Sequence, residues 1–154
     1  MNIPMEIERK YLIAKLPDNL EQYDYKDIEQ GYLNTDPVVR IRRSGEKYTL
    51  TYKGSGLMMR EEYNLLLNEE AYYHLREKVD GRIIKKRRYL IPYQMGENEY
   101  LIELDVFEGD LKPLLLAEVE FETREAANSF VPPDWFGEDV TFSMTYHNSN
   151  LSRL

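Results

Sequence analysis

Polar and hydrophobic residues alternate along much of this chain, and an alternation of period two predicts β-strands. In Met5–Ile13, for example, Glu6, Glu8 and Lys10 alternate with mainly apolar residues. Glycine-containing turns such as Ser44-Gly45-Glu46 separate neighbouring strands, as in antiparallel hairpins. The pattern predicts eight strands, over Met5–Ile13, Asp27–Leu33, Val38–Arg43, Tyr48–Lys53, Leu57–Leu67, Arg82–Pro92, Glu99–Phe107 and Leu115–Glu122.

Helical patterns are few. Asn68 is a favourable N-cap for a helix that continues to about Val79, because apolar residues recur there at helical spacing. A second helix is expected from Thr123 to Val131, ending before two prolines. A short helix is also compatible with Asn19–Tyr23. We therefore expect an α+β, mostly antiparallel β protein that forms one domain over residues 1–154.

Charged side chains share faces of the predicted strands, since alternate residues of a strand point the same way. Such a row is most simply a solvated outer face. However, the opposite faces are apolar and must be covered, and the two predicted helices carry apolar stripes suited to this. An eight-stranded closed barrel, with charges inside and helices packed outside, satisfies both facts. The rows are Glu6, Glu8 and Lys10; Arg40 and Arg42; Lys86 and Arg88; Glu103 and Asp105; and Glu118, Glu120 and Glu122.

Composition narrows the classes of function. The 20 basic and 28 acidic residues give a net charge of −8, which argues against nucleic-acid binding and against an anionic membrane surface. The absence of cysteine excludes disulfides, zinc–thiolate sites and thiol nucleophiles. Of the two histidines, His147 is expected at the surface. No signal peptide or membrane-spanning run is visible, so a soluble, cytoplasmic protein is the expectation.

Inward-facing charges indicate the kind of ligand. Buried charges must be paired, hydrated or matched to ions, because burying one alone costs several kcal/mol. Basic and acidic rows in one cavity fit a ligand that combines anionic groups with a metal. A polyphosphate with Mg²⁺ or Mn²⁺ has this composition: Arg and Lys bind phosphate oxygens, and carboxylates bind a hard cation.

Several sequence blocks resemble the CYTH superfamily, also called triphosphate tunnel metalloenzymes. The first is the E-x-E-x-K signature at Glu6-Ile7-Glu8-Arg9-Lys10. Further blocks follow in the family's order over nearly the whole chain. They are Gln30-Gly31-Tyr32-Leu33, Val39-Arg40-Ile41-Arg42-Arg43, Leu50-Thr51-Tyr52-Lys53-Gly54, Arg60-Glu61-Glu62, Lys86-Arg87-Arg88-Tyr89, Asp105-Val106-Phe107-Glu108-Gly109, Ala117-Glu118-Val119-Glu120-Phe121 and Val140-Thr141.

The resemblance implies an eight-stranded tunnel that binds a triphosphate and one or two divalent metals. By position, the implied metal ligands are Glu6, Glu8, Glu118 and Glu120, and the implied triphosphate-binding residues are Lys10, Arg40, Arg42, Lys53, Arg60, Lys86 and Arg88. Tyr32 matches a tunnel tyrosine that assists Lys10 with a proton in relatives, although a core tyrosine fits equally well. The implied catalytic set is therefore Lys10, Glu8, Glu120 and Tyr32.

Three further acidic residues are supporting candidates. Glu62 belongs to an R-x-E-x-E pattern whose last position here is Asn64, a departure that puts a second metal in doubt. Glu103 and Asp105 either bind metal or orient the basic residues, and we favour the second role.

The leading hypothesis is a metal-dependent phosphohydrolase that cleaves inorganic tripolyphosphate or a similar small triphosphate, such as a nucleoside or thiamine triphosphate. One alternative is a class IV-type adenylyl cyclase, for which Tyr72, Tyr93 or Trp135 could stack on the base. Another is a non-catalytic polyphosphate-binding module. The sequence leaves open whether the protein forms a homodimer.

Overall fold

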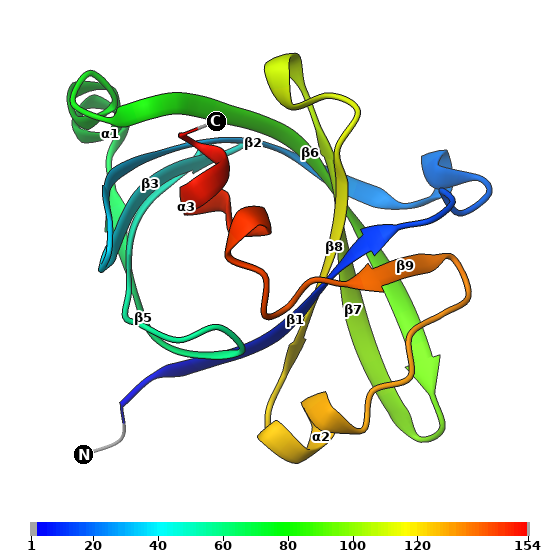
Figure 1. Cartoon of the computed structure of the whole chain (residues 1–154). Helices are drawn as coiled ribbons and strands as arrows, with labels where there is room; N and C mark the ends of the chain where they lie inside the picture. Colours follow the sequence, from blue (N-terminus) through cyan, green and yellow to red (C-terminus); the bar gives the residue numbers. More distant parts are fainter. Residues whose placement is uncertain (1–2, 154) are drawn as a thin grey trace.

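The structure, a computed structural model, describes residues 3–153 and contains one antiparallel sheet that closes on itself. The strands follow the order β5-β4-β3-β2-β6-β7-β8-β1-β9, and β1 also pairs with β5. The first eight strands therefore form a closed barrel, as predicted, and Figure 1 looks along it. The strands are β1 (Met5–Ile13), β2 (Asp24–Thr35), β3 (Val38–Ser44), β4 (Lys47–Lys53), β5 (Met59–Leu67), β6 (Asp80–Met95), β7 (Asn98–Phe107), β8 (Leu115–Phe121) and β9 (Phe136–Asp139).

Strand β1 closes the barrel by pairing along both edges. One edge pairs with β8 from Ile7 to Leu12. The other edge pairs first with β5, where Glu6 lies opposite Arg60, and then with β9, where Tyr11 lies opposite Asp139. The short strand β9 was not predicted from the sequence and lies outside the barrel proper.

Two strands are longer than the alternation predicted. β2 begins at Asp24, and β6 continues to Met95, beyond the predicted end at Pro92. Residues of β6 after Leu90 pair only with β7, so one edge of this extension is free. Pro92 is tolerated there because its missing N–H interrupts no ladder.

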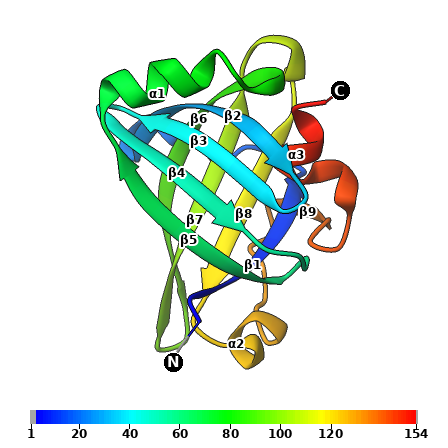
Figure 2. The ribbon, with the colours of Figure 1, turned by 90° about the vertical axis from the view of Figure 1, so that its left-hand side faces the viewer.

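The predicted helices exist but are shorter, and Asn68 is the N-cap as predicted. The Asn68 side chain accepts a hydrogen bond of 2.7 Å from the Ala71 amide at the start of α1 (Glu69–Arg76). Thr123 does the same for Ala126 at the start of α2 (Arg124–Asn128). Figure 2 shows both helices on the outside of the barrel.

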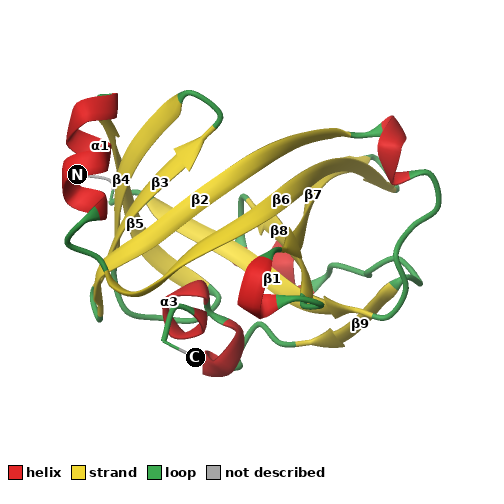
Figure 3. Cartoon of the chain, turned by 90° about the horizontal axis from the view of Figure 1, so that it is seen from above, coloured by secondary structure: helices red, strands yellow, loops and turns green. Residues whose placement is uncertain are grey.

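The C-terminal segment, residues 144–153, departs from the expectation that every helix packs outside. A 3₁₀ helix (Met144–Tyr146) and α3 (Asn148–Leu151) lie across one end of the barrel (Figures 1 and 3). Neither was predicted, because four or three residues are too few to show a helical period. Two further 3₁₀ helices cover Leu20–Gln22 and Gly109–Leu111.

Two apolar clusters stabilise the barrel. One lies on its outer face, where Leu104, Val119 and Phe121 pack beneath Phe130 and Phe136. The other fills the barrel near the C-terminal segment and consists of Tyr32, Val38, Ile84, Phe107, Leu116, Val140 and Leu151. Within residues 3–153, no helix is both long and apolar enough to cross a membrane.

We expect Leu104→Ala to lower the free energy of unfolding by about 2–5 kcal/mol, because the Leu104 side chain is completely buried and its loss leaves a cavity. Leu66→Ala removes the same atoms from a side chain that is 78% exposed and should change stability by less than about 0.5 kcal/mol. Urea denaturation measures both. Equal losses of stability in the two variants would contradict the burial of Leu104 in the outer cluster.

Candidate active site

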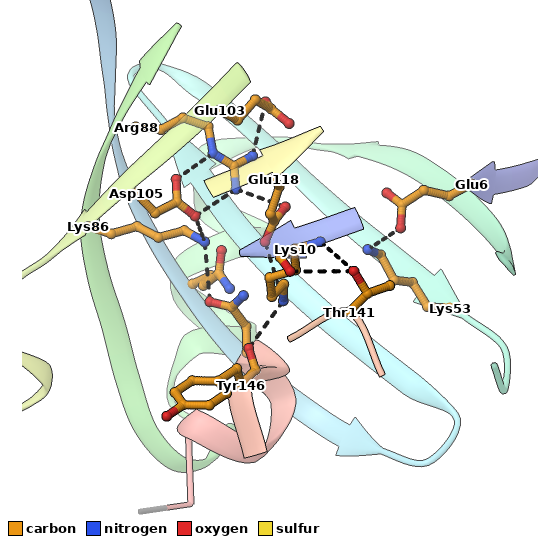
Figure 4. A network of polar contacts seen from close by, with 12 residues as sticks. Glu6, Lys10, Lys53, Lys86, Arg88, Glu103, Asp105, Glu118, Thr141 and Tyr146 are labelled. Atoms are coloured by element: carbon orange, nitrogen blue, oxygen red, sulfur yellow. Dashed lines mark hydrogen bonds and ion pairs between the residues drawn. The ribbon is translucent and has the colours of Figure 1, made fainter. Parts of the chain in front are cut away.

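The charged rows point into the barrel. Lys10, Arg40, Lys53 and Glu118 are all buried, although none lies in an apolar cluster. Strand alternation places them on one face, and closure of the sheet turns that face inward. The tunnel formed in this way carries charged side chains from all eight strands of the barrel, and several of these side chains are drawn in Figure 4.

Asp105 holds two of the cations. It accepts hydrogen bonds of 2.7 and 2.9 Å from Arg88 and forms a 2.7 Å ion pair with Lys86. Burial acts to raise the pKa of Asp105, but Arg88 and Lys86 outweigh it and hold this pKa below its ordinary value. Glu103 adds a 3.2 Å contact to Arg88 (Figure 4). Asp105 and Glu103 thus orient basic residues in this structure.

Lys86 also points into the barrel but does not line the central cavity. Its side chain is completely buried between Asp105 and the Asn148 amide, whose oxygen is 3.2 Å from Nζ. Burial lowers the pKa of Lys86 to about 7, against the opposing effect of Asp105. The charge of Lys86 therefore reaches the cavity only indirectly, through Asp105 and Asn148.

Lys10 makes two contacts inside the tunnel. Its Nζ donates a hydrogen bond of 3.1 Å to the Tyr146 carbonyl and lies 3.4 Å from Glu118 (Figure 4). Burial acts to raise the pKa of Glu118, but Lys10 and Arg88 keep that pKa well below its usual range. Glu118 is therefore an anion held between cations.

The centre of the tunnel is almost filled by its own side chains. The central cavity has a volume of about 30 Å³, which is room for roughly one water molecule. It is lined by Glu8, Lys10, Tyr32, Val38, Arg40, Arg42, Lys53, Arg60, Glu118, His147, Asn148 and Ser149. Five of these residues are basic and two are acidic, so an anion finds a strongly positive environment here.

Gln30 organises one wall of this cavity. Its side-chain oxygen accepts hydrogen bonds of 2.9 and 2.6 Å from Arg42, and its amide donates to the Tyr32 hydroxyl at 3.0 Å. Burial, together with the charges of Arg40 and Arg88, lowers the pKa of Arg42 to about 9. The wall thus presents concentrated positive charge that protein carboxylates only partly neutralise.

The tunnel has two different ends. The end beside the β3–β4 hairpin, which we call the hairpin mouth, contains a cavity of about 280 Å³. At the opposite end, which we call the C-terminal mouth, residues 144–153 leave a cleft of about 440 Å³ beside the loop after β4. Figure 3 shows α3 and the β3–β4 hairpin at opposite ends of the molecule.

Carboxylates gather on the β1 side of the tunnel. Glu6 and Glu62 both contact Lys53, at 2.8 and 3.4 Å. Burial and the neighbouring Glu8 raise the pKa of Glu6 to about 8, and burial with Glu118 raises that of Glu8 to about 7. Glu120 lies at the exposed end of β8.

These oxygen donors are of the type that Mg²⁺ and Mn²⁺ prefer. Glu8 faces the cavity and makes no side-chain hydrogen bond or ion pair with any residue of the described range, so it has capacity for a cation. However, no three Asp, Glu or His side chains among residues 3–153 converge on one metal-sized site. The present pairing of Glu6 with Lys53 and of Glu118 with Lys10 accounts for this separation.

The sequence did not identify the tunnel residues of the C-terminal segment. His147 was expected at the surface, which is wrong: it is 8% exposed and lines the central cavity. Burial and the charges of Lys10 and Arg60 lower its pKa to about 4. His147, Asn148 and Ser149 reach the tunnel only through the chain fold. Gln30, by contrast, could have been found, because it shares a strand face with Tyr32.

Comparisons with known proteins agree with this architecture. Residues 4–141 match the CYTH domain. An inorganic triphosphatase of Nitrosomonas europaea is 41% identical over 96% of each chain, and one of Acetivibrio thermocellus is 33% identical over 95% of this chain and 92% of its own. A crystal structure of an inorganic triphosphatase superposes with a TM-score of 0.69 at 37% identity, covering 99% of this chain and 97% of its own.

We expect Asp105→Asn to lower the free energy of unfolding by about 3–5 kcal/mol, because it leaves Arg88 and Lys86 buried without their shared carboxylate. Asp27→Asn breaks a similar pair with Arg87 at the exposed outer face and should cost less than about 1 kcal/mol. Chemical denaturation of both variants tests this, and a small loss for Asp105→Asn would show that water reaches the pair.

His147→Gln should flatten the dependence of stability on pH. The unfolded chain protonates this histidine below about pH 6.5, whereas the folded protein does so only near pH 4. The unfolded state binds more protons in this interval, so His147 makes stability fall as the pH decreases from 6.5 to 4. Thermal unfolding between pH 4 and 8 measures the effect, with the exposed His74→Gln as control. Parallel curves for His147→Gln and the wild type would refute it.

Proposed function

The chain belongs to the CYTH domain family, and on that premise we propose that it is a metal-dependent triphosphatase that hydrolyses inorganic tripolyphosphate to pyrophosphate and orthophosphate. The two relatives named inorganic triphosphatase, similar over nearly the whole chain, support the reaction. The observation that carries the proposal is the set of five basic side chains around the central cavity, Lys10, Arg40, Arg42, Lys53 and Arg60.

Electrostatics favours a compact polyanion in this cavity. Arg42 now donates hydrogen bonds to the neutral side-chain oxygen of Gln30, and Lys10 donates one to the Tyr146 carbonyl, with Glu118 at 3.4 Å. Phosphate oxygens carry full charge and form stronger hydrogen bonds with such donors. We infer that the triphosphate displaces the internal partners, since a cavity of about 30 Å³ otherwise has no room for it.

The proposed metal ligands are Glu6, Glu8, Glu118 and Glu120, with Mg²⁺ or Mn²⁺ as the ion. When bound, such an ion neutralises charge on phosphate oxygens and lowers the pKa of a coordinated water. Glu8 supports the assignment because its carboxylate faces the cavity without a protein partner. Glu6 and Glu118 become available when Lys53 and Lys10 turn to the phosphates.

Lys10 and Tyr32 are proposed to handle protons during hydrolysis. As water adds to phosphorus it gives up one proton, and as the P–O bond to pyrophosphate breaks, the leaving oxygen gains negative charge and takes up one proton from a donor, which the proton lost by the water then restores. The Tyr32 hydroxyl accepts a hydrogen bond from Gln30, so its own proton is free to be donated into the cavity. The Lys10 ammonium lines the same cavity.

The structure gives the adenylyl cyclase alternative no support. The three aromatic candidates for base stacking pack outside the tunnel: Tyr72 of α1 against Glu29, Tyr93 against Phe130, and Trp135 against Phe136. Among the described residues, Tyr32 and His147 are the ones with aromatic rings that line the central cavity, and none lines the hairpin mouth. A purely anion-binding module is also disfavoured, because the carboxylates of Glu8 and Glu118 weaken anion binding.

The proposal is tested by measuring phosphate and pyrophosphate release from tripolyphosphate, ATP and thiamine triphosphate, each with Mg²⁺, Mn²⁺ or EDTA. We expect metal-dependent turnover that is fastest with tripolyphosphate. Glu8→Gln keeps the shape of the side chain but removes its charge, and should lower turnover by about 100-fold or more. Glu70→Gln, on the exposed face of α1, should leave it unchanged.

Two results would overturn the proposal. Binding of tripolyphosphate without turnover under any metal condition would indicate the non-catalytic module. Pyrophosphate formed from ATP without orthophosphate would indicate the cyclase.

A further inference from the structure

We propose that the hairpin mouth is a subsite for a fourth phosphate, so that the tunnel also binds linear tetrapolyphosphate and does so more tightly than tripolyphosphate. This inference rests on the proposed function and extends it to chain length. It concerns Lys26 and Lys47, two residues to which the sequence blocks described above assign no role.

Both lysines belong to the inner face of the barrel. Lys26 on β2 is opposite Arg88 on β6, two residues before the buried Ile28. Lys47 begins β4 on the same face as Thr49, Thr51 and Lys53, since alternate residues of a strand point the same way. Their side chains line the cavity of about 280 Å³ at the hairpin mouth, together with Ile28, Arg40, Arg42, Ser44, Thr49, Asn64, Arg88 and Glu103.

The charges at this mouth are unbalanced. Five basic residues line the cavity with a single carboxylate, Glu103, which is already 3.2 Å from Arg88. Neither Lys26 nor Lys47 makes a side-chain hydrogen bond or ion pair with any residue between 3 and 153. In a chain with a net charge of −8, this concentration of positive charge attracts an anion that the protein itself does not supply.

The positive charge is continuous with the central cavity. Arg40 and Arg42 line both cavities, so a linear anion that leaves the centre meets no neutral gap before Lys26 and Lys47. The C-terminal mouth offers a different path. There the cleft contains Arg60 and Arg153 but also Asp36, Leu57 and Met144, and the segment that ends in the buried Leu151 lies across it. A longer chain is therefore favoured at the hairpin mouth.

The residues of the hairpin mouth favour binding of a further phosphate over binding of a nucleoside. No aromatic ring of the described residues lines this cavity, so a base that projects from a bound triphosphate finds no stacking surface. A fourth phosphate at the same place gains two ammonium groups as partners. Tetrapolyphosphate and ATP therefore differ at this mouth, although both contain a triphosphate unit.

The test is isothermal titration calorimetry of tripolyphosphate, tetrapolyphosphate and ATP in EDTA, where hydrolysis does not interfere. The variant is Lys26→Met/Lys47→Met, and low ionic strength keeps the exposed charges unscreened. Its matched control is Lys78→Met/Lys85→Met, which removes the same charge from exposed positions on the outside of the barrel. We expect the mouth variant to weaken tetrapolyphosphate binding by about fivefold to tenfold, and tripolyphosphate and ATP binding by about twofold or less.

Three outcomes would overturn the subsite: equal losses for all three ligands, the same losses in the control variant, or wild-type protein that binds tetrapolyphosphate no more tightly than tripolyphosphate. Hydrolysis of tripolyphosphate by wild-type protein with Mg²⁺ or Mn²⁺ is measured alongside. Absence of that hydrolysis counts against the proposed function, whereas its presence with any of the three outcomes counts against the subsite alone.

Discussion

The need to offset buried charge, by ion pairs or by hydrogen bonds, is the constraint on which this structure depends. The interior of this barrel carries charged side chains from all eight of its strands. Asp105 makes this possible on one wall by binding both Arg88 and Lys86, and Glu118 does so near Lys10. Removing either carboxylate leaves cations in a setting where desolvation costs several kcal/mol. The apolar core is accordingly displaced to the outer face and to one end of the barrel.

The charges that stabilise the fold are also the groups that the proposed reaction needs. Lys10, Lys53 and Arg42 are held by Tyr146, Glu6 and Gln30, each at hydrogen-bonding distance. These internal partners keep the cations in place at little cost when a triphosphate enters, since one set of hydrogen bonds replaces another. The almost filled central cavity follows from the same arrangement, because unpaired cations would otherwise repel each other across the tunnel.

Closure of the barrel makes the tunnel directional. β1 pairs with β5, β8 and β9 in turn, so the strand that carries Glu6, Glu8 and Lys10 is fixed on both edges. The residues after β9 then turn back across one end, where His147 and Asn148 join the cavity wall. The hairpin mouth keeps Lys26 and Lys47 exposed, and the two ends of the tunnel consequently differ in both charge and access.

The sequence by itself determined the eight strands of the barrel, the Asn68 cap and the rows of charges, because these depend on residues two to four positions apart. Together with the E-x-E-x-K block it also led to the barrel and to a triphosphate as ligand. Only the tertiary structure decided which cations line the central cavity: Lys86 and Arg42 look alike in an alternating strand, yet one is buried against Asp105 and the other lines the cavity. It also decided the position of His147, which lies beside Lys10 although 137 positions separate them in the sequence. Such contacts depend on how strands pair and where the chain returns, and no local pattern of residues encodes them.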